Sequence, residues 1–171
     1  HSSFAALGVL ADVTDKVTTW GKSADYFPGP WASTVYQDKN YGVPDNSNCL
    51  VQWYNKAFTD PAGVSAPKTW DELRATSKAL TEGDRFGIAM SAVKSEEGTF
   101  QWLPFLWMTG EDLATLDSDG GRMAMQLWVD LVNDGSMSPG IISWTQSDVK
   151  GQFQNGKAAL MVNGPWQIPT L

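Results

Sequence analysis

Apolar and polar residues along this chain follow helical and strand-like periods in turn, and the clearest helical period lies between residues 119 and 134. Two adjacent rows of apolar side chains, each with a spacing of four residues, make up this pattern: Met123, Leu127 and Leu131, then Ala124, Trp128 and Val132. Gly135 follows the last row, and glycine commonly ends helices because it adopts the left-handed conformation easily. The spacing therefore predicts a helix over 119–134 that packs against a core.

A second helix is predicted to begin at Thr69. Thr69 and Glu72 have the spacing of a capping box, in which the hydroxyl and the carboxylate accept hydrogen bonds from each other's main-chain amides. The inward face is expected to carry three large apolar residues with a serine beside them: Trp70, Leu73, Leu80 and Ser77. Two further helices are expected, one over 99–108 that Pro104 kinks or delays, and one over 147–155.

Buried strands are predicted over 50–55, 86–90 and 158–162, and a short strand over 41–43. Residues 4–20 indicate a short helix followed by a loop, and a turn-rich stretch comes next. Strands that alternate with helices favour an α/β fold, in which a mostly parallel sheet is covered by helices on both faces.

In sheets of this kind, ligands bind beyond the carboxyl ends of the strands. The loops over 93–101 and 164–167 follow two of these predicted ends. The second loop contains Trp166, which Pro165 holds at the start of a helical turn. Its flat, rigid face suits the C–H face of a sugar ring, and a buried core position is the alternative.

The loop over 93–101 and the residue after it supply a second group of candidate ligand contacts. Phe100 and Trp102 are each interpreted as an aromatic platform or as a core residue. Gln101 and Glu97 are candidates for hydrogen bonds to ligand hydroxyl groups. Solvated loop charges are the alternative for Glu97 and its neighbour Glu96.

Polar segments elsewhere in the chain hold further candidates. Trp144 lies in a polar loop and is expected to be exposed, since such a loop offers no core for it to fill. After Pro44, the side chains of Asp45, Asn46 and Asn48 can exchange hydrogen bonds with hydroxyl groups. Their alternative role is to form turns.

Composition and charge exclude several function classes. The net charge of −7 argues against a nucleic-acid-binding surface, which needs a basic footprint. No apolar run approaches the 18 or more residues that indicate a membrane-spanning helix. Nine tryptophans in 171 residues is a high content, and surplus tryptophan is common where carbohydrate is bound.

The side chains available for catalysis are few. His1 is the only histidine and Cys49 the only cysteine, so histidine-dependent catalysis, a histidine metal site, an internal disulfide and a bound cofactor are not expected. Cys49 opens an apolar run and is predicted to be a buried, unreactive thiol. Glycoside hydrolysis needs only two carboxylates, so it stays open as an alternative function with Glu96 and Asp148 as the pair.

Several short motifs, in the same order along the chain, point to one family. They are Tyr41-Gly42-Val43-Pro44, Trp53-Tyr54-Asn55-Lys56, Pro67-Lys68-Thr69-Trp70-Asp71-Glu72-Leu73, Leu127-Trp128-Val129-Asp130-Leu131-Val132, Ser138-Pro139-Gly140 and, after Asn155-Gly156-Lys157, Asn163-Gly164-Pro165-Trp166. Over residues 36–166 the sequence resembles the extracellular solute-binding proteins of sugar ABC transporters, the maltose-binding-protein-like family. Each motif is weak alone, but together in register they are specific.

The resemblance implies a fold and a domain organisation. Members of the family have two α/β lobes with the ligand between them and are more than twice as long as this chain. Residues 1–46 are expected to be a remnant of the first lobe with the crossing segment. Residues 47–171 would form a second lobe of the periplasmic-binding-protein type that is incomplete at its C-terminal end. The chain is accordingly expected to be an internal fragment.

The resemblance also implies a function. It predicts non-catalytic binding of a carbohydrate or related polyol, which closure of the two lobes would complete, and delivery to the membrane permease of an ABC transporter. Nucleic acid and direct membrane insertion are not expected. The implied location is extracellular or periplasmic, and lipid anchoring through a missing N-terminus stays open.

Particular residues take their roles from the family pattern. By register, Phe100 stands where the family has an aromatic residue that stacks on sugar, and Trp166 belongs to the family's terminal motif. The family places ligand contacts close to Gln146, so Gln146 and Trp144 are candidates together. Asn48 stands where maltose-binding members carry a glutamate, and this departure puts maltodextrin specificity in doubt.

Overall fold

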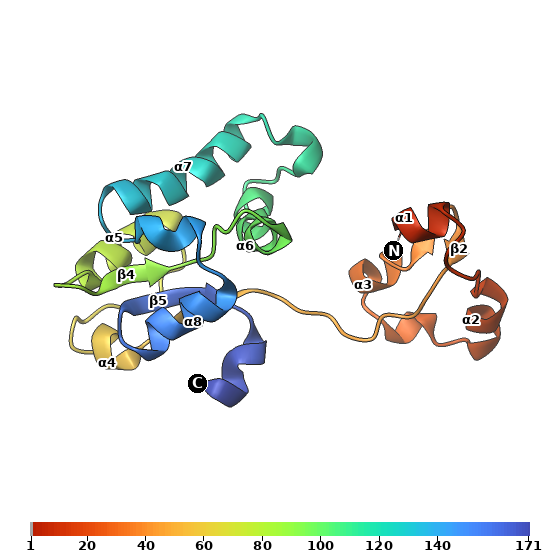
Figure 1. Ribbon diagram of the computed structural model, residues 1–171, viewed down its shortest axis with the longest axis horizontal. Helices are drawn as coiled ribbons and strands as arrows, with labels where there is room; N and C mark the ends of the chain where they lie inside the picture. Colours follow the sequence, from red (N-terminus) through yellow and green to blue (C-terminus); the bar gives the residue numbers. More distant parts are fainter. Residues whose placement is uncertain (1) are drawn as a thin grey trace. The chain divides into compact units, whose positions relative to one another are not determined.

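A computed structural model describes residues 2–171, and the chain divides into two compact units, His1–Asn48 and Cys49–Leu171 (Figure 1). The first unit contains only short elements: α1 (Ser2–Ala6), α2 (Thr14–Trp20), η1 (Ser23–Asp25), α3 (Pro28–Ala32), β1 (Val35–Tyr36) and β2 (Lys39–Asn40). Its buried residues in the described part are three, Ala5, Val17 and Thr34, so this unit has a very small core.

The strand predicted over 41–43 is not present, and a hairpin just before it takes its place. Gln37 and Asp38 both have positive φ, 47° and 61°, and form the two-residue turn between β1 and β2. This turn pairs Val35 with Asn40, so the ladder of two short strands is already complete before residue 41. The helix expected within residues 4–20 is instead two, α1 and α2, with a turn between them.

The second unit is built on a three-stranded sheet of β3 (Val51–Tyr54), β4 (Phe86–Ala89) and β5 (Ala158–Asn163) in the order β3-β5-β4. β4 and β5 are parallel, but β3 is antiparallel to β5, with Val51 opposite Asn163. The expected mostly parallel sheet is therefore wrong: the sheet is mixed. Periodicity locates a strand but does not give its direction, and here the chain enters β3 beside the end of β5.

Helices cover both faces of this sheet, as predicted (Figure 1). α5 (Trp70–Leu80), α6 (Glu96–Trp107) and α7 (Asp119–Asn133) share the larger core with Ile88 and Leu160. α8 (Gln146–Gln154) packs Val149 against Ala89 and Met161 in the smaller core. Short helical turns complete the unit: α4 (Lys56–Thr59), η2 (Leu113–Thr115), η3 (Pro139–Ile142) and η4 (Pro165–Thr170).

Most helix starts lie near their predicted residues. The Thr69 hydroxyl accepts a hydrogen bond from the Glu72 amide at 3.1 Å, but the Glu72 carboxylate accepts from the Lys68 amide, one residue earlier than a capping box requires. α6 begins at Glu96 rather than Thr99, because Ser95 caps it through the Glu97 amide, and it continues through Pro104.

Three expectations about burial are wrong. Met123 is 59% exposed although the rest of its row on α7 is buried, so the packed face of this helix is narrower than the apolar pattern. Cys49 is exposed, because it lies before β3 rather than within it. β3 is an edge strand, and its end residues Val51 and Tyr54 are exposed.

Gly87→Ala is expected to lower the free energy of unfolding by about 1–3 kcal/mol or more. A Cβ on Gly87 in β4 would overlap the main-chain carbonyl of Ser77 in α5, and backbone cannot move aside as a flexible side chain can. Urea unfolding of wild type and variant measures the change.

Gly151→Ala is the matched control, because no atom lies within 4 Å of the position of its new Cβ on α8. We expect this variant to be neutral or to stabilise the chain by up to about 1 kcal/mol, since alanine favours helix. Equal unfolding midpoints for Gly87→Ala and wild type would contradict the close packing of β4 on α5.

Candidate functional site

Phe100 and Trp166 are brought together at one edge of the sheet of the second unit. Their ring centroids lie 6.3 Å apart at an interplanar angle of 33°, and the residues are 39% and 36% exposed. Phe100 lies on α6, the helix after β4, and Trp166 lies on η4, directly after β5. Because β4 and β5 are parallel, both segments leave the sheet at its carboxyl edge.

Local sequence sets the position of the Trp166 ring. Gly164 precedes η4, and a Cβ at that position would overlap the six-membered part of the indole ring. Only glycine lets the ring lie this close to the main chain. Pro165 is the first residue of η4, and its fixed φ favours the helical turn that follows. The motif Asn163-Gly164-Pro165-Trp166 therefore specifies a tight turn with a half-exposed tryptophan.

Asn163 lies beneath this turn and is fully buried. Its Oδ1 accepts hydrogen bonds from the Gly164 amide at 2.9 Å and from Gln167 Nε2 at 3.3 Å. Its Nδ2 donates to the Gln146 carbonyl at 2.9 Å, and its own carbonyl accepts from Trp53 Nε1 at 3.2 Å. Asn163 was not among the predicted site residues; a polar residue at the end of an otherwise apolar strand was the signal for it.

Glu97 is half-buried and is not the solvated loop charge that was its alternative. Its Oε1 accepts a hydrogen bond from the Gln146 amide, the first of α8, and lies 3.5 Å from the Ser91 hydroxyl, which donates its proton to the Trp144 carbonyl at 2.6 Å. A carboxylate at this position is favoured because the first amides of a helix have no partner within the helix. The side-chain Nε2 of Gln146 is buried without a hydrogen-bond partner among residues 2–171.

Two tryptophans that were predicted as ligand contacts are partly buried against the hydrophobic clusters, and their role as ligand contacts stays a prediction. Trp144 was expected to be exposed in a polar loop, but it lies between η3 and α8, is half-buried and packs against both hydrophobic clusters. Trp102 is also partly buried against the larger cluster. Gln101 is fully buried on α6, and its amide has no partner within the described part of the chain.

Asp45, Asn46 and Asn48 lie in the extended segment at the end of the first unit and are exposed. They form no side-chain hydrogen bonds with residues 2–171. As ligand contacts they stay a prediction, as does the assignment of residues 1–46 and 47–171 to two lobes.

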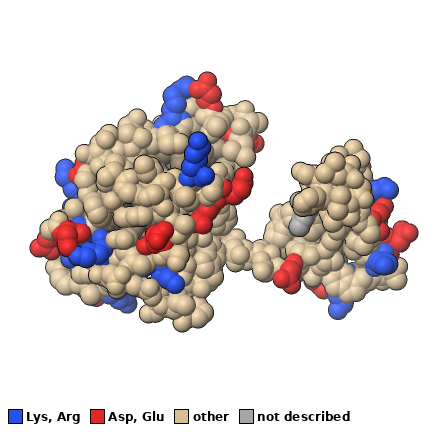
Figure 2. Space-filling view, viewed as in Figure 1, with Lys and Arg blue, Asp and Glu red and all other residues tan. Residues whose placement is uncertain are grey.

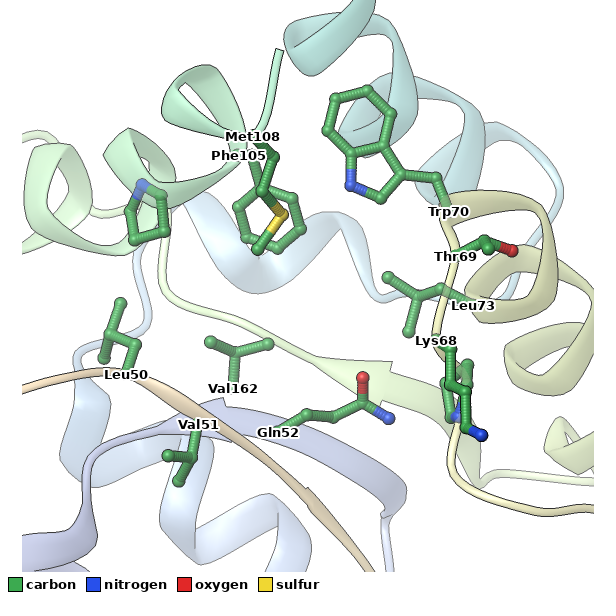
Figure 3. A pocket seen from close by; sticks show the side chains of 12 residues that line it. Leu50, Val51, Gln52, Lys68, Thr69, Trp70, Leu73, Phe105, Met108 and Val162 are labelled. Carbon is green, nitrogen blue, oxygen red and sulfur yellow. The ribbon is translucent and has the colours of Figure 1, made fainter. Parts of the chain in front are cut away.

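A cavity of about 170 Å³ lies elsewhere in the second unit, between β3, the start of α5 and α6 (Figure 3). Its lining is mostly apolar and includes Trp70, Phe105 and Val162, while Gln52, Lys68 and Thr69 are its polar side chains. None of the predicted ligand contacts lines it. It offers few partners for a polyhydroxylated ligand.

Charge and metal-binding side chains add little to the site. Acidic and basic side chains among residues 2–171 are interspersed on the face drawn in Figure 2 and form no continuous basic surface there. Within the same range, no group of three histidine, cysteine, aspartate or glutamate side chains is placed to hold a metal ion.

None of the helices described is long and apolar enough to span a membrane.

The sequence matches the family of bacterial extracellular solute-binding proteins over residues 2–169. The chain belongs to this family. The resemblance found in the sequence motifs is thereby confirmed. The family consists of extracellular binding proteins rather than enzymes, so the expected absence of catalysis rests on this membership. The lipid anchor stays a prediction.

Individual relatives agree with this membership. A putative binding protein of Brucella abortus is 28% identical over 161 residues, which cover 85% of this chain and 39% of that protein. An ABC transporter solute-binding protein of Thermotoga lettingae, solved with α-D-tagatose, is 29% identical with a TM-score of 0.87, over 99% of this chain and 46% of that one. The GacH receptor of Streptomyces glaucescens, solved unliganded and with acarbose, is 29% identical with a TM-score of 0.82, over 99% and 44%.

These comparisons show the α/β fold of the periplasmic-binding-protein type. They also show that this chain spans less than half the length of the relatives that it matches.

The carboxylate pair considered for glycoside hydrolysis is not supported by its surroundings. Asp148 Oδ2 accepts hydrogen bonds from the Thr145 hydroxyl at 2.7 Å and the Thr145 amide at 2.8 Å, which completes a capping box on α8. These bonds, first that from the hydroxyl and then that from the amide, lower the pKa of Asp148 below 3.8. The general acid of such a pair needs a raised pKa, so Asp148 does not fit that role, and for the role of base or nucleophile its Oδ2 is already engaged by Thr145. Asp148 therefore acts as a helix cap.

Asp148→Ala is expected to destabilise the chain at neutral pH and to have less effect in acid. The pKa of Asp148 is lowered in the folded chain, so its stabilising effect is complete above the unfolded value of 3.8 and is lost as the pH falls through the lower folded value. Thermal unfolding at pH 7 and at about pH 2, below the ordinary range of aspartate pKa values, measures the difference.

Asp71→Ala is a suitable control, because Asp71 lies in the first turn of α5 and forms no side-chain hydrogen bond with the described residues. Its effect is expected to be smaller at pH 7. The same melting-temperature difference between wild type and Asp148→Ala at both pH values would contradict the capping role.

Proposed function

We propose that this chain supplies a ligand-binding lobe of an ABC-transporter solute-binding protein, and that its ligand is a neutral carbohydrate or polyol for delivery to a membrane permease. The lobe holds the ligand by aromatic stacking and hydroxyl hydrogen bonds, without chemical change. Closure of a second lobe over the ligand would complete the site.

The half-exposed pair of Phe100 and Trp166 is the observation that carries this proposal. Two large aromatic rings side by side at the carboxyl edge of an α/β sheet offer apolar faces at a position where such folds bind ligands. The C–H faces of sugars pack on such rings, while the hydroxyl groups at the sugar's edge stay free for polar partners.

Polar atoms beside this pair are suited to those hydroxyl groups. Glu97 Oε2 accepts no hydrogen bond from residues 2–171, whereas Oε1 accepts one from the Gln146 amide. Gln146 Nε2 likewise has no partner among those residues. Because a polar group that is shielded from water without a partner costs free energy, a ligand hydroxyl group at Gln146 Nε2 would be favourable.

The ligand class is supported by two relatives and by charge. The relatives solved with α-D-tagatose and with acarbose are both 29% identical to this chain. The net charge of −7 disfavours an anionic ligand. A neutral polyhydroxylated ligand agrees with both observations, and the departure at Asn48 disfavours a maltodextrin.

Trp166→Ala is expected to weaken binding of D-tagatose about 5- to 150-fold in a two-lobed protein that carries this sequence. The stacking face contributes about 1–3 kcal/mol that no neighbouring side chain replaces. The melting temperature should stay within a few degrees, since the side chain lies at the surface. Isothermal titration calorimetry and thermal unfolding measure the two effects.

Trp107→Ala is the matched control, because Trp107 also lies on the surface, 57% exposed at the end of α6. This variant should bind sugar as wild type does. Equal affinities for wild type and Trp166→Ala would show that Trp166 is no ligand contact. Failure of the wild type to bind any member of a panel of neutral sugars and polyols would contradict the ligand class.

A further inference from the structure

We propose that Asn163 is the positioning residue that holds the Trp166 ring against Phe100. The effect of Asn163 on the position of the ring follows from the described contacts alone. Its effect on ligand affinity rests on the proposed function. Asn163 itself is buried beneath the turn and would not touch the ligand.

The first step is the connection from Asn163 to the Trp166 turn. Oδ1 accepts from the amide that precedes η4, Gly164, and from the side chain of Gln167 within η4. These bonds hold the two ends of the segment that carries Trp166. The Gly164 main chain then forms the surface against which the indole ring rests.

The second step is the connection from Asn163 to the Phe100 helix. Nδ2 donates to the Gln146 carbonyl, and the Gln146 amide donates to Glu97 on α6, one turn before Phe100. The main chain of Gln146 is therefore held from both sides. A continuous series of hydrogen bonds joins the segment of one ring to the helix of the other.

Asparagine is well matched to this position. The side chain at this position must accept hydrogen bonds from two donors and donate one to a carbonyl. A carboxamide does both, because its oxygen accepts and its nitrogen donates. Leucine has a similar size but supplies neither, so Asn163→Leu would leave the buried Gly164 amide without its partner and remove the bond that joins Asn163 to the Gln146 carbonyl.

The test uses the 171-residue chain labelled with 5-fluorotryptophan and followed by ¹⁹F NMR, without ligand. Trp166→Phe identifies the Trp166 resonance by its loss. In the wild-type background, Phe100→Leu should move that resonance, because the Phe100 ring lies 6.3 Å away and its ring current acts on the indole. The size of this displacement reports whether the two rings are adjacent.

In the Asn163→Leu background, Phe100→Leu is expected to move the Trp166 resonance by less than half as much. A purely structural role for Asn163 would lower the unfolding midpoint and leave this displacement unchanged. The same displacement in both backgrounds would overturn the proposal. If Asn163→Leu does not fold, which the remaining tryptophan resonances would reveal, Gln167→Met takes its place and should reduce the displacement in the same direction.

Gln154→Met is the matched control. Gln154 Nε2 donates to the Thr170 carbonyl at 2.5 Å, so this variant removes a hydrogen bond to the same η4 turn without touching Asn163. It should preserve the full displacement. If Gln154→Met reduced the displacement of the Trp166 resonance as much as Asn163→Leu or Gln167→Met does, the η4 turn as a whole would position the ring. That result would overturn the role of Asn163.

A second measurement applies to ligand affinity. With D-tagatose as the probe in the two-lobed protein, Asn163→Leu is expected to weaken binding at least about tenfold, and Gln154→Met to leave it unchanged. Unchanged affinity in Asn163→Leu would overturn the consequence for binding. A wild type that binds no sugar would count against the proposed function only, because the NMR comparison needs no ligand.

Discussion

The parallel pairing of β4 with β5 is the constraint on which the candidate site depends. It aligns Phe86 with Ala158 and Ala89 with Met161, so that both strands end at one edge of the sheet. α6 and η4 follow these two ends, and each brings one aromatic ring to that edge. A register slip of one residue would turn every side chain of a strand to the opposite face, so the cores on the two faces also fix the site.

The same edge holds most of its polar groups in defined hydrogen bonds. A buried polar group without a partner costs about 1–3 kcal/mol, so a structure that buries several of them must pair them. Here Asn163, Glu97 and the main chain of Gln146 supply those partners to one another. The result is a fixed polar base beneath two half-exposed rings, which limits the conformational freedom that a ligand would have to remove.

Family membership and the surroundings of Asp148 agree on a non-catalytic chain. The family binds extracellular solutes. In the carboxylate pair considered for hydrolysis, Asp148 accepts a hydrogen bond from the Thr145 hydroxyl and caps α8. This chain covers less than half the length of its relatives, so the aromatic pair would form one wall of a binding site rather than a whole one. The apolar cavity beside β3 lies apart from these residues and has a different chemical character.

The sequence by itself determined the family and the approximate positions of α5, α7, α8 and the three strands of the second unit. It also predicted Phe100 and Trp166 as ligand contacts, and this role stays a prediction. These features follow from local periodicity, helix caps and motifs, all of which depend on residues that are close together in the sequence. Only the tertiary structure decided that β3 runs antiparallel to β5, that Trp144 packs against the core, and that Asn163 joins two distant segments. These features depend on which segments far apart in the sequence become neighbours, and no local pattern contains that information.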